Sequence, residues 1–76
     1  MTNVQKAFAK VVSESGLNLV QIAQLSGIKQ QTLSAVKTGR RQISLKVIIK
    51  MCDALEISYD ELIKALVIDI KSAGTL

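Results

Sequence analysis

Apolar residues recur every three or four positions along most of the chain, and no proline interrupts them. Near the start they fall at Val4, Ala7, Phe8, Val11 and Val12, which is the apolar stripe of an amphipathic helix. Glycines break the pattern at later positions, where a helix can end on a residue of left-handed conformation. This spacing constrains the chain more than any other feature, and it predicts an all-α fold of short helices.

Side chains that can cap a helix mark where these helices begin. The capping-box pattern, a Ser, Thr or Asn followed three residues later by Gln or Glu, occurs as Thr2 with Gln5, Asn18 with Gln21 and Ser58 with Glu61. The predicted helices span residues 3–15, 19–26 and 30–37, followed by a fourth that Ser44 caps and a fifth that begins near residue 58. Apolar contacts of the last four helices are expected from Ile22, Ala23, Leu25, Leu33, Val36, Leu45, Ile48, Cys52, Leu55, Leu62, Ile63, Leu66, Val67 and Ile70. Ile28 and Ile43 are expected to point inward from the connecting segments.

No repeat, low-complexity segment or linker divides the 76 residues, and a chain of this length can form one compact core. We therefore expect one five-helix domain over residues 1–76. Its core is expected over about residues 3–63, an extension of the fifth helix over about 64–71, and a frayed tail over 72–76.

The residues that the chain lacks argue against several classes of protein. There is no histidine and only one cysteine, Cys52, so neither the usual zinc ligand sets nor an internal disulfide can form. No glycine-rich phosphate loop occurs, and the adjacent Asp60 and Glu61 are explained by a helix start, whose dipole favours acidic residues. We expect no catalytic residue, no metal and no cofactor.

Two further features that the sequence lacks indicate which ligands the protein does not bind and where in the cell to expect it. Only Phe8 and Tyr59 are aromatic, which argues against binding of single-stranded nucleic acid, whose bases stack on exposed rings. No apolar run approaches the roughly 20 residues that cross a bilayer, and no signal-peptide pattern begins the chain. We expect a cytoplasmic protein that does not bind a membrane.

Charge is distributed unevenly along the chain, because all six acidic residues lie outside residues 15–52. That 38-residue segment carries six positive charges, on Lys29, Lys37, Arg40, Arg41, Lys46 and Lys50. A surface of one sign attracts a polyanion at long range and gains affinity by releasing counterions. Charge alone fits a solvated lysine face equally well, and for Lys46 and Lys50 we favour that interpretation.

Apolar and small residues around Gly27 have the spacing of a helix-turn-helix. With Leu19 as the first position, the interior positions of this motif are occupied by Ile22, Ala23, Ile28, Leu33 and Val36. Ala23 has to be small, because the two helices cross closely there. Gly27 supplies the positive φ that the tight turn requires.

Two segments resemble a known family. Residues 18–39 read NLVQIAQLSGIKQQTLSAVKTG, which looks like the helix-turn-helix of the Cro/C1-type repressors of temperate phages and mobile elements. Residues 54–62 read ALEISYDEL, which is similar to the entry into that family's fifth helix. The resemblance covers about residues 3–63. It implies a compact lambda-repressor-like domain, with the helix-turn-helix at its second and third helices, that regulates transcription by binding double-stranded DNA.

The resemblance also implies which residues touch DNA. In this family the third helix lies in the major groove, with its first residues at the base edges. Base reading is carried over to Gln30, Gln31, Ser34 and Ala35, of which Ala35 can only touch a methyl group. Contacts with the DNA backbone are carried over to Asn18, Lys29, Thr32, Lys37, Thr38, Arg40 and Arg41.

Simpler interpretations of some of these residues stay open. Asn18 fits a helix cap, Thr38 fits a helix end, and the two glutamines fit exposed polar positions. One departure from the family is Leu19, where many members carry a glutamine that contacts phosphate and braces the third helix. That contact is expected to be missing here.

The extension of the fifth helix allows two interpretations. In one, Leu66, Val67 and Ile70 form a homodimer contact. In the other, the helix folds back on the first helix and completes the core, and the two interpretations are compatible in part. We expect a repressor that binds an inverted repeat as a homodimer and blocks RNA polymerase by occupying the DNA. The alternatives are an antitoxin that binds both DNA and a toxin, and a protein-interaction module on the same fold.

Overall fold

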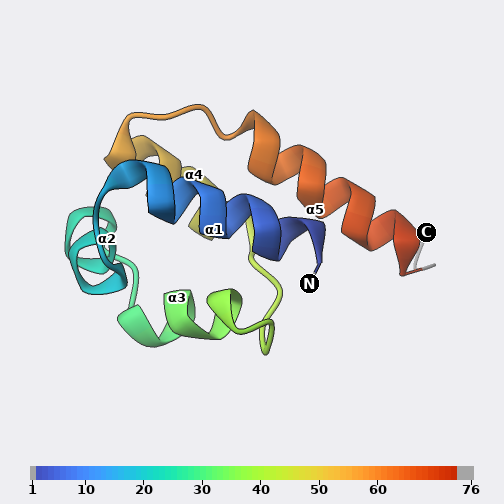
Figure 1. The fold of residues 1–76 in the computed structure, drawn as a ribbon, viewed down its shortest axis with the longest axis horizontal. Helices are drawn as coiled ribbons and strands as arrows, with labels where there is room; N and C mark the ends of the chain where they lie inside the picture. Colours follow the sequence, from blue (N-terminus) through green and yellow to red (C-terminus); the bar gives the residue numbers. More distant parts are fainter. Residues whose placement is uncertain (1, 74–76) are drawn as a thin grey trace.

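The computed structural model describes residues 2–73, which form five α-helices (Figure 1). They are α1 (Asn3–Ser15), α2 (Leu19–Ser26), α3 (Gln30–Lys37), α4 (Leu45–Leu55) and α5 (Asp60–Ser72). The described residues contain no strand, so the predicted all-α fold is confirmed, and the bounds of α1, α2 and α3 are those expected. Within this part of the chain, no helix has the length and apolar character needed to cross a membrane.

Reciprocal hydrogen bonds cap the first two helices, as the sequence predicts. Thr2 Oγ1 accepts a hydrogen bond from the Gln5 N–H at 3.1 Å, while Gln5 Oε1 accepts one from the Thr2 N–H at 3.0 Å. Asn18 and Gln21 form the same pair, at 2.8 and 3.0 Å. Each pair satisfies two amide groups that the start of a helix otherwise leaves without a partner.

One apolar core joins all five helices. Its buried side chains are Val4, Phe8, Ile22, Ala23, Ile28, Leu33, Val36, Ile43, Ile48, Met51, Cys52, Leu62 and Ala65. α5 lies along α1, and α4 packs against α2 (Figure 1). The inward positions expected for Ile28 and Ile43 are confirmed.

Two leucines expected to make core contacts are exposed instead, Leu25 by 60% and Leu45 by 51%. Leu25 is the next-to-last residue of α2, and Leu45 is the first residue of α4. No neighbouring helix covers the side chain at either position. Met51 was not among the residues that the helical period singled out. It is fully buried beside Cys52, because the inner face of α4 is wide enough for both.

α5 begins later than predicted, and the prediction of a capping box at its start is wrong. The helix starts at Asp60, and Ser58 Oγ accepts a hydrogen bond from the Asp60 N–H at 3.3 Å rather than from Glu61. A serine that bonds the amide two residues further on forms a turn rather than a cap. The carboxylate of Glu61 pairs with Lys10 of α1 at 3.4 Å, so the contact it makes is tertiary rather than local.

α5 folds back on α1, which was one of the two interpretations of its extension. Asp69 Oδ2 accepts a hydrogen bond from the Val4 N–H at 2.8 Å, and Oδ1 accepts bonds from the Asn3 N–H and Nδ2 at 3.1 and 3.0 Å. The carboxylate therefore lies at the positive end of the α1 dipole. Burial acts to raise the pKa of Asp69, but these hydrogen bonds outweigh it, and the pKa is lowered.

The burial of the apolar side chains varies along the rest of α5. Leu66 and Ile70 are half-buried, whereas Val67 and Ile68 are each 42% exposed. Of the frayed tail expected over residues 72–76, Ser72 is still helical, and residues 74–76 lie outside the described residues.

Candidate nucleic-acid interface

α2 and α3 are joined by a tight turn that begins at Gly27. This glycine has a φ of 74°, and its N–H donates to the Ala23 carbonyl at 2.9 Å. The interior positions predicted for a helix-turn-helix are all buried: Ile22, Ala23, Ile28, Leu33 and Val36. The two short helices therefore form one packed unit that leaves the outer face of α3 uncovered.

The outer face of α3 is polar. Gln30 and Gln31 are exposed at its first turn, whereas Thr32, Ser34 and Ala35 are half-buried. A glutamine amide both donates and accepts hydrogen bonds, which suits the edge of a base. The two glutamines that the sequence singled out thus lie side by side at the N-terminus of the helix, and Ala35 adds only a methyl group.

A shallow hollow of about 300 Å³ lies on this face, between Gln30, Gln31, Ser34 and Arg40. Arg40 comes from the loop after α3, and its Nε donates to Thr38 Oγ1 at 3.2 Å. The loop therefore returns towards the helix and adds a cationic side chain to the polar ones.

Two residues expected to contact the DNA backbone have structural roles. Asn18 Oδ1 is the cap acceptor of α2, but its Nδ2 group donates no hydrogen bond within residues 2–73. The Thr38 hydroxyl donates to the carbonyls of Ser34 and Ala35, at 3.1 and 3.3 Å. Both the helix-cap and the helix-end interpretations are therefore observed, and Asn18 still has two donors that can reach a phosphate.

Exposed cations surround the ends of α3. Lys29 precedes the helix, Lys37 ends it, and Arg40 and Arg41 follow it. None of the four pairs with a carboxylate, since the ion pair found among the described residues joins Lys10 of α1 to Glu61. Their charge is not neutralised within this part of the protein and is available to phosphate groups.

Gln5 has a second role that the capping pattern did not predict. Its Nε2 donates to the Lys37 carbonyl at the end of α3, at 3.4 Å. A β-carbon at Gly39 would come within 2.6 Å of the same Nε2, and the φ of 79° at Gly39 also favours glycine. The start of α1 is thus tied to the end of α3. No local spacing signals this contact, because the two residues are 32 positions apart.

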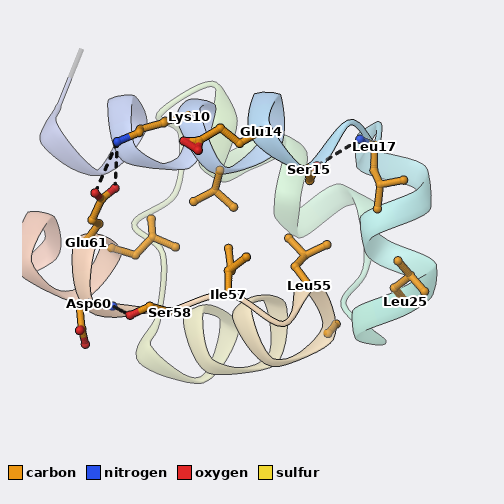
Figure 2. Close-up of a pocket in the computed structure, with 13 residues that line it drawn as sticks. Lys10, Glu14, Ser15, Leu17, Leu25, Leu55, Ile57, Ser58, Asp60 and Glu61 are labelled. Atoms are coloured by element: carbon orange, nitrogen blue, oxygen red, sulfur yellow. Dashed lines mark hydrogen bonds and ion pairs between the residues drawn. The ribbon is translucent and has the colours of Figure 1, made fainter.

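A larger hollow, of about 850 Å³, is lined by α1, α2, the end of α4 and the start of α5, but by no residue of α3 (Figure 2). The pair of Lys10 and Glu61 lies at one end of it and Leu25 at the other (Figure 2). Glu14 and Asp60 add carboxylates that have no ionic partner within residues 2–73. This hollow is therefore a surface distinct from the outer face of α3, and its carboxylates repel phosphates.

Residues 2–73 contain no group of three or more His, Cys, Asp or Glu side chains that could hold a metal ion. Cys52 is buried in the core, and burial raises the pKa of its thiol. The thiol is therefore protonated at neutral pH, which makes it a poor nucleophile and a poor ligand.

α2 and α3 are two short helices joined by a glycine turn. The inner face of α3 is buried, and its outer face is polar and flanked by cations. This arrangement defines a helix-turn-helix DNA-binding domain. The family model described as Helix-turn-helix, HTH_3, matches residues 5–62. The chain is also 34% identical, over 56 residues, to the uncharacterized HTH-type transcriptional regulator y4dJ of Sinorhizobium fredii; the alignment covers 74% of this chain and 73% of that protein. The chain therefore belongs to the Cro/C1-type helix-turn-helix family of transcriptional regulators. No solved structure matches it.

Family membership confirms the resemblance and the lambda-repressor-like fold expected from the sequence. It makes the chain a DNA-binding transcriptional regulator and not an enzyme. The match ends at residue 62, so most of α5 lies beyond the part that the family shares.

Proposed function

We propose that the chain is a repressor that binds an inverted-repeat operator as a homodimer and blocks RNA polymerase by occupying the DNA. The observation that carries the proposal is the uncovered polar face of α3, with Gln30 and Gln31 at its first turn and unpaired cations at both ends. Such a helix fits the major groove, where base edges can be distinguished. Because the ligand is genomic DNA, the proposal also puts the protein in the cytoplasm.

In this proposal base reading and backbone contact fall to different residues. Gln30 and Gln31 read bases, with Ser34 and the methyl group of Ala35 one turn further along. The residues that contact the DNA backbone are Asn18, Lys29, Thr32, Lys37 and Arg41. Thr38, which the resemblance also assigned to the backbone, is left out because its hydroxyl and its N–H both donate within the end of α3. Leu19 packs against the core and has no polar group for a phosphate, so the flanking cations supply most of the affinity.

The homodimer follows from the size of the recognition helix. α3 has eight residues and is therefore only about 12 Å long, enough to reach a few base pairs. Two copies whose helices lie about 34 Å apart reach two half-sites on one face of the DNA. Val67 and Ile68 of α5 are the exposed apolar side chains we assign to the dimer contact, with half-buried Leu66 and Ile70 at its edge.

Selection of bound sequences from a random pool of double-stranded DNA tests the proposal. We expect an enriched inverted repeat whose half-site centres are about 34 Å, one helical turn, apart. Recovery of a single unrepeated site would contradict the homodimer, and recovery of no enriched sequence would contradict a specific repressor. Transcription from a promoter that carries the selected site should fall when the protein is produced, and a rise would contradict repression.

A protein partner is the second candidate function, and the larger hollow favours it. Its lining is apolar at Leu25, Leu55 and Ile57 and acidic at Glu14 and Asp60. The occupant we propose is a segment of a toxin or another partner protein that carries apolar and basic side chains, since such a segment complements both the lining and its charge. This function is compatible with DNA binding, because the hollow and α3 share no residue.

A library of random displayed peptides would test the second function. We expect the protein to enrich peptides that combine leucine-like side chains with Lys or Arg. The double variant Glu14→Gln, Asp60→Asn should lose this enrichment while it still binds DNA. Enrichment of acidic peptides, or of none, would exclude the hollow as such a docking site.

A further inference from the structure

We propose that Arg40 determines specificity by reading the major-groove edge of a guanine, an assignment that rests on the proposed DNA-binding function. The family resemblance assigned Arg40 to the DNA backbone. In the structure it lines the hollow on the outer face of α3 together with Gln30, Gln31 and Ser34. A molecule that enters this hollow therefore meets the glutamine amides and the arginine at once.

Two hydrogen bonds hold Arg40 against the end of α3. Its backbone N–H donates to the Ala35 carbonyl at 3.0 Å, and its Nε donates to Thr38 Oγ1 at 3.2 Å. Thr38 is held in turn, because its hydroxyl donates to the Ser34 carbonyl at 3.1 Å. The last turn of the helix thus orients the guanidinium group, which lowers the entropy that a contact with DNA would cost.

The donors left on Arg40 decide which base suits the hollow. Of the five N–H groups of a guanidinium, Thr38 uses the one on Nε, so both terminal nitrogens can still donate. Guanine is the base that presents two acceptors, O6 and N7, on its major-groove edge, and an arginine fork matches them. The neighbouring Gln30 and Gln31 suit adenine, which presents a donor and an acceptor. The hollow therefore favours a half-site in which a G·C pair lies close to an A·T pair.

A phosphate is the competing target for Arg40, and Arg41 provides a matched control. Both arginines are exposed, and both backbone N–H groups donate to the Ala35 carbonyl, at 3.0 and 3.2 Å. They differ in that Arg40 lines the hollow and Arg41 does not. Loss of a base contact changes sequence preference, whereas loss of a phosphate contact lowers affinity for every sequence alike.

The experiment compares the wild type, Arg40→Ala and Arg41→Ala on the operator that the wild type selects. Each guanine of the operator is replaced in turn by 7-deazaguanine, which lacks the N7 acceptor. We expect one replacement to weaken binding of the wild type and of Arg41→Ala but not of Arg40→Ala. In a repeated selection, Arg40→Ala should lose discrimination at that base pair by about 5- to 150-fold.

Each outcome separates this assignment from the function on which it rests. If Arg40→Ala keeps the wild-type base preference, or is weakened by the same 7-deazaguanine, the assignment is wrong and the proposed function stands. A uniform loss on all sequences, equal to that of Arg41→Ala, would return Arg40 to the phosphate contacts. If the wild type itself enriches no sequence, the proposed function fails and the assignment fails with it.

Discussion

Gln30 shows how the core determines what a single surface residue can do. Leu33 and Val36 point inward from the same helix and are 0% and 1% exposed. Their burial fixes the rotation of α3 about its axis, so Gln30 has to face outward. Its amide makes no hydrogen bond within residues 2–73 and is available to another molecule.

Gln30→Ala should relax discrimination at one base pair by about 1 to 3 kcal/mol, because an alanine has no donor or acceptor for the base edge. Its free energy of unfolding should change by less than about 0.5 kcal/mol, since the side chain is exposed. Titration against the operator and its single-base variants measures the first effect. Equal losses on the operator and on random DNA would contradict base reading by Gln30.

Glu56 is a residue whose backbone is strained. It ends α4 with a φ of 56°, in the left-handed region where a β-carbon is unfavourable. Glu56→Gly should therefore raise the free energy of unfolding by up to about 1 kcal/mol, visible as a higher Tm. Glu56→Ala keeps the β-carbon and should show no such gain. A lower Tm for the glycine variant would show that the strain is offset elsewhere.

At the scale of elements, α1 and α5 stabilise each other through charge as well as packing. The Asp69 carboxylate of α5 accepts the hydrogen bonds that a local cap would otherwise accept at the start of α1. Thr2 caps the same helix end from within the chain's first residues. The start of α1 is therefore held both locally and by a residue 66 positions away.

Asp69→Asn should lower the free energy of unfolding at neutral pH by about 1 kcal/mol, because the ionised cap is lost. The pKa of Asp69 is lowered from 3.8 in the folded chain, so its ionised form stabilises the fold above that value. This contribution is lost as the pH falls from about 4 through the lowered pKa. Thermal unfolding from neutral to acid pH should show a smaller decline for Asp69→Asn than for the wild type.

Asp53→Asn is the control for that experiment. Asp53 is exposed on α4, and its carboxylate accepts no hydrogen bond among the described residues. The variant should unfold as the wild type does at neutral pH. A loss equal to that of Asp69→Asn would mean that net charge, rather than the contact with α1, is responsible.

At the scale of the whole molecule, the fold places cationic, acidic and apolar side chains on different surfaces. Unpaired cations and glutamines lie on and around α3, while Glu14, Asp60 and Glu61 line the larger hollow, which α3 does not reach. The exposed apolar pair of Val67 and Ile68 lies on a third element, α5. The contacts proposed for DNA, a protein segment and a second copy therefore use separate surfaces of one small core.

The double variant Val67→Lys, Ile68→Lys should be monomeric in sedimentation velocity, because two charges would be placed in the proposed apolar contact. Affinity for an operator with two half-sites should fall by at least about tenfold, while affinity for a single half-site should not fall. Ile57→Lys is the matched control, since Ile57 is 41% exposed and each residue of the pair 42%. A dimer that survives the double variant would place the interface elsewhere.

Local features of the fold could be predicted because each depends on residues close in sequence. The capping pairs of Thr2 with Gln5 and of Asn18 with Gln21 join residues three positions apart. The turn at Gly27 and the buried positions around it follow from helical spacing and one positive φ. The same reasoning failed for Ser58 and Glu61, because α5 begins at Asp60 and Ser58 accepts a hydrogen bond from the Asp60 N–H, while Glu61 pairs with Lys10, 51 positions away.

The apolar period and its glycines determine by themselves that the chain is helical, where α2 and α3 meet, and that Gln30 and Gln31 face outward. Only the tertiary structure decides that Asp69 caps α1, that Gln5 reaches the end of α3, and that Arg40 joins the glutamines in one hollow. The physical reason is the range of the interactions. A helical period carries information over three or four residues, whereas these contacts depend on how the common core brings distant segments together.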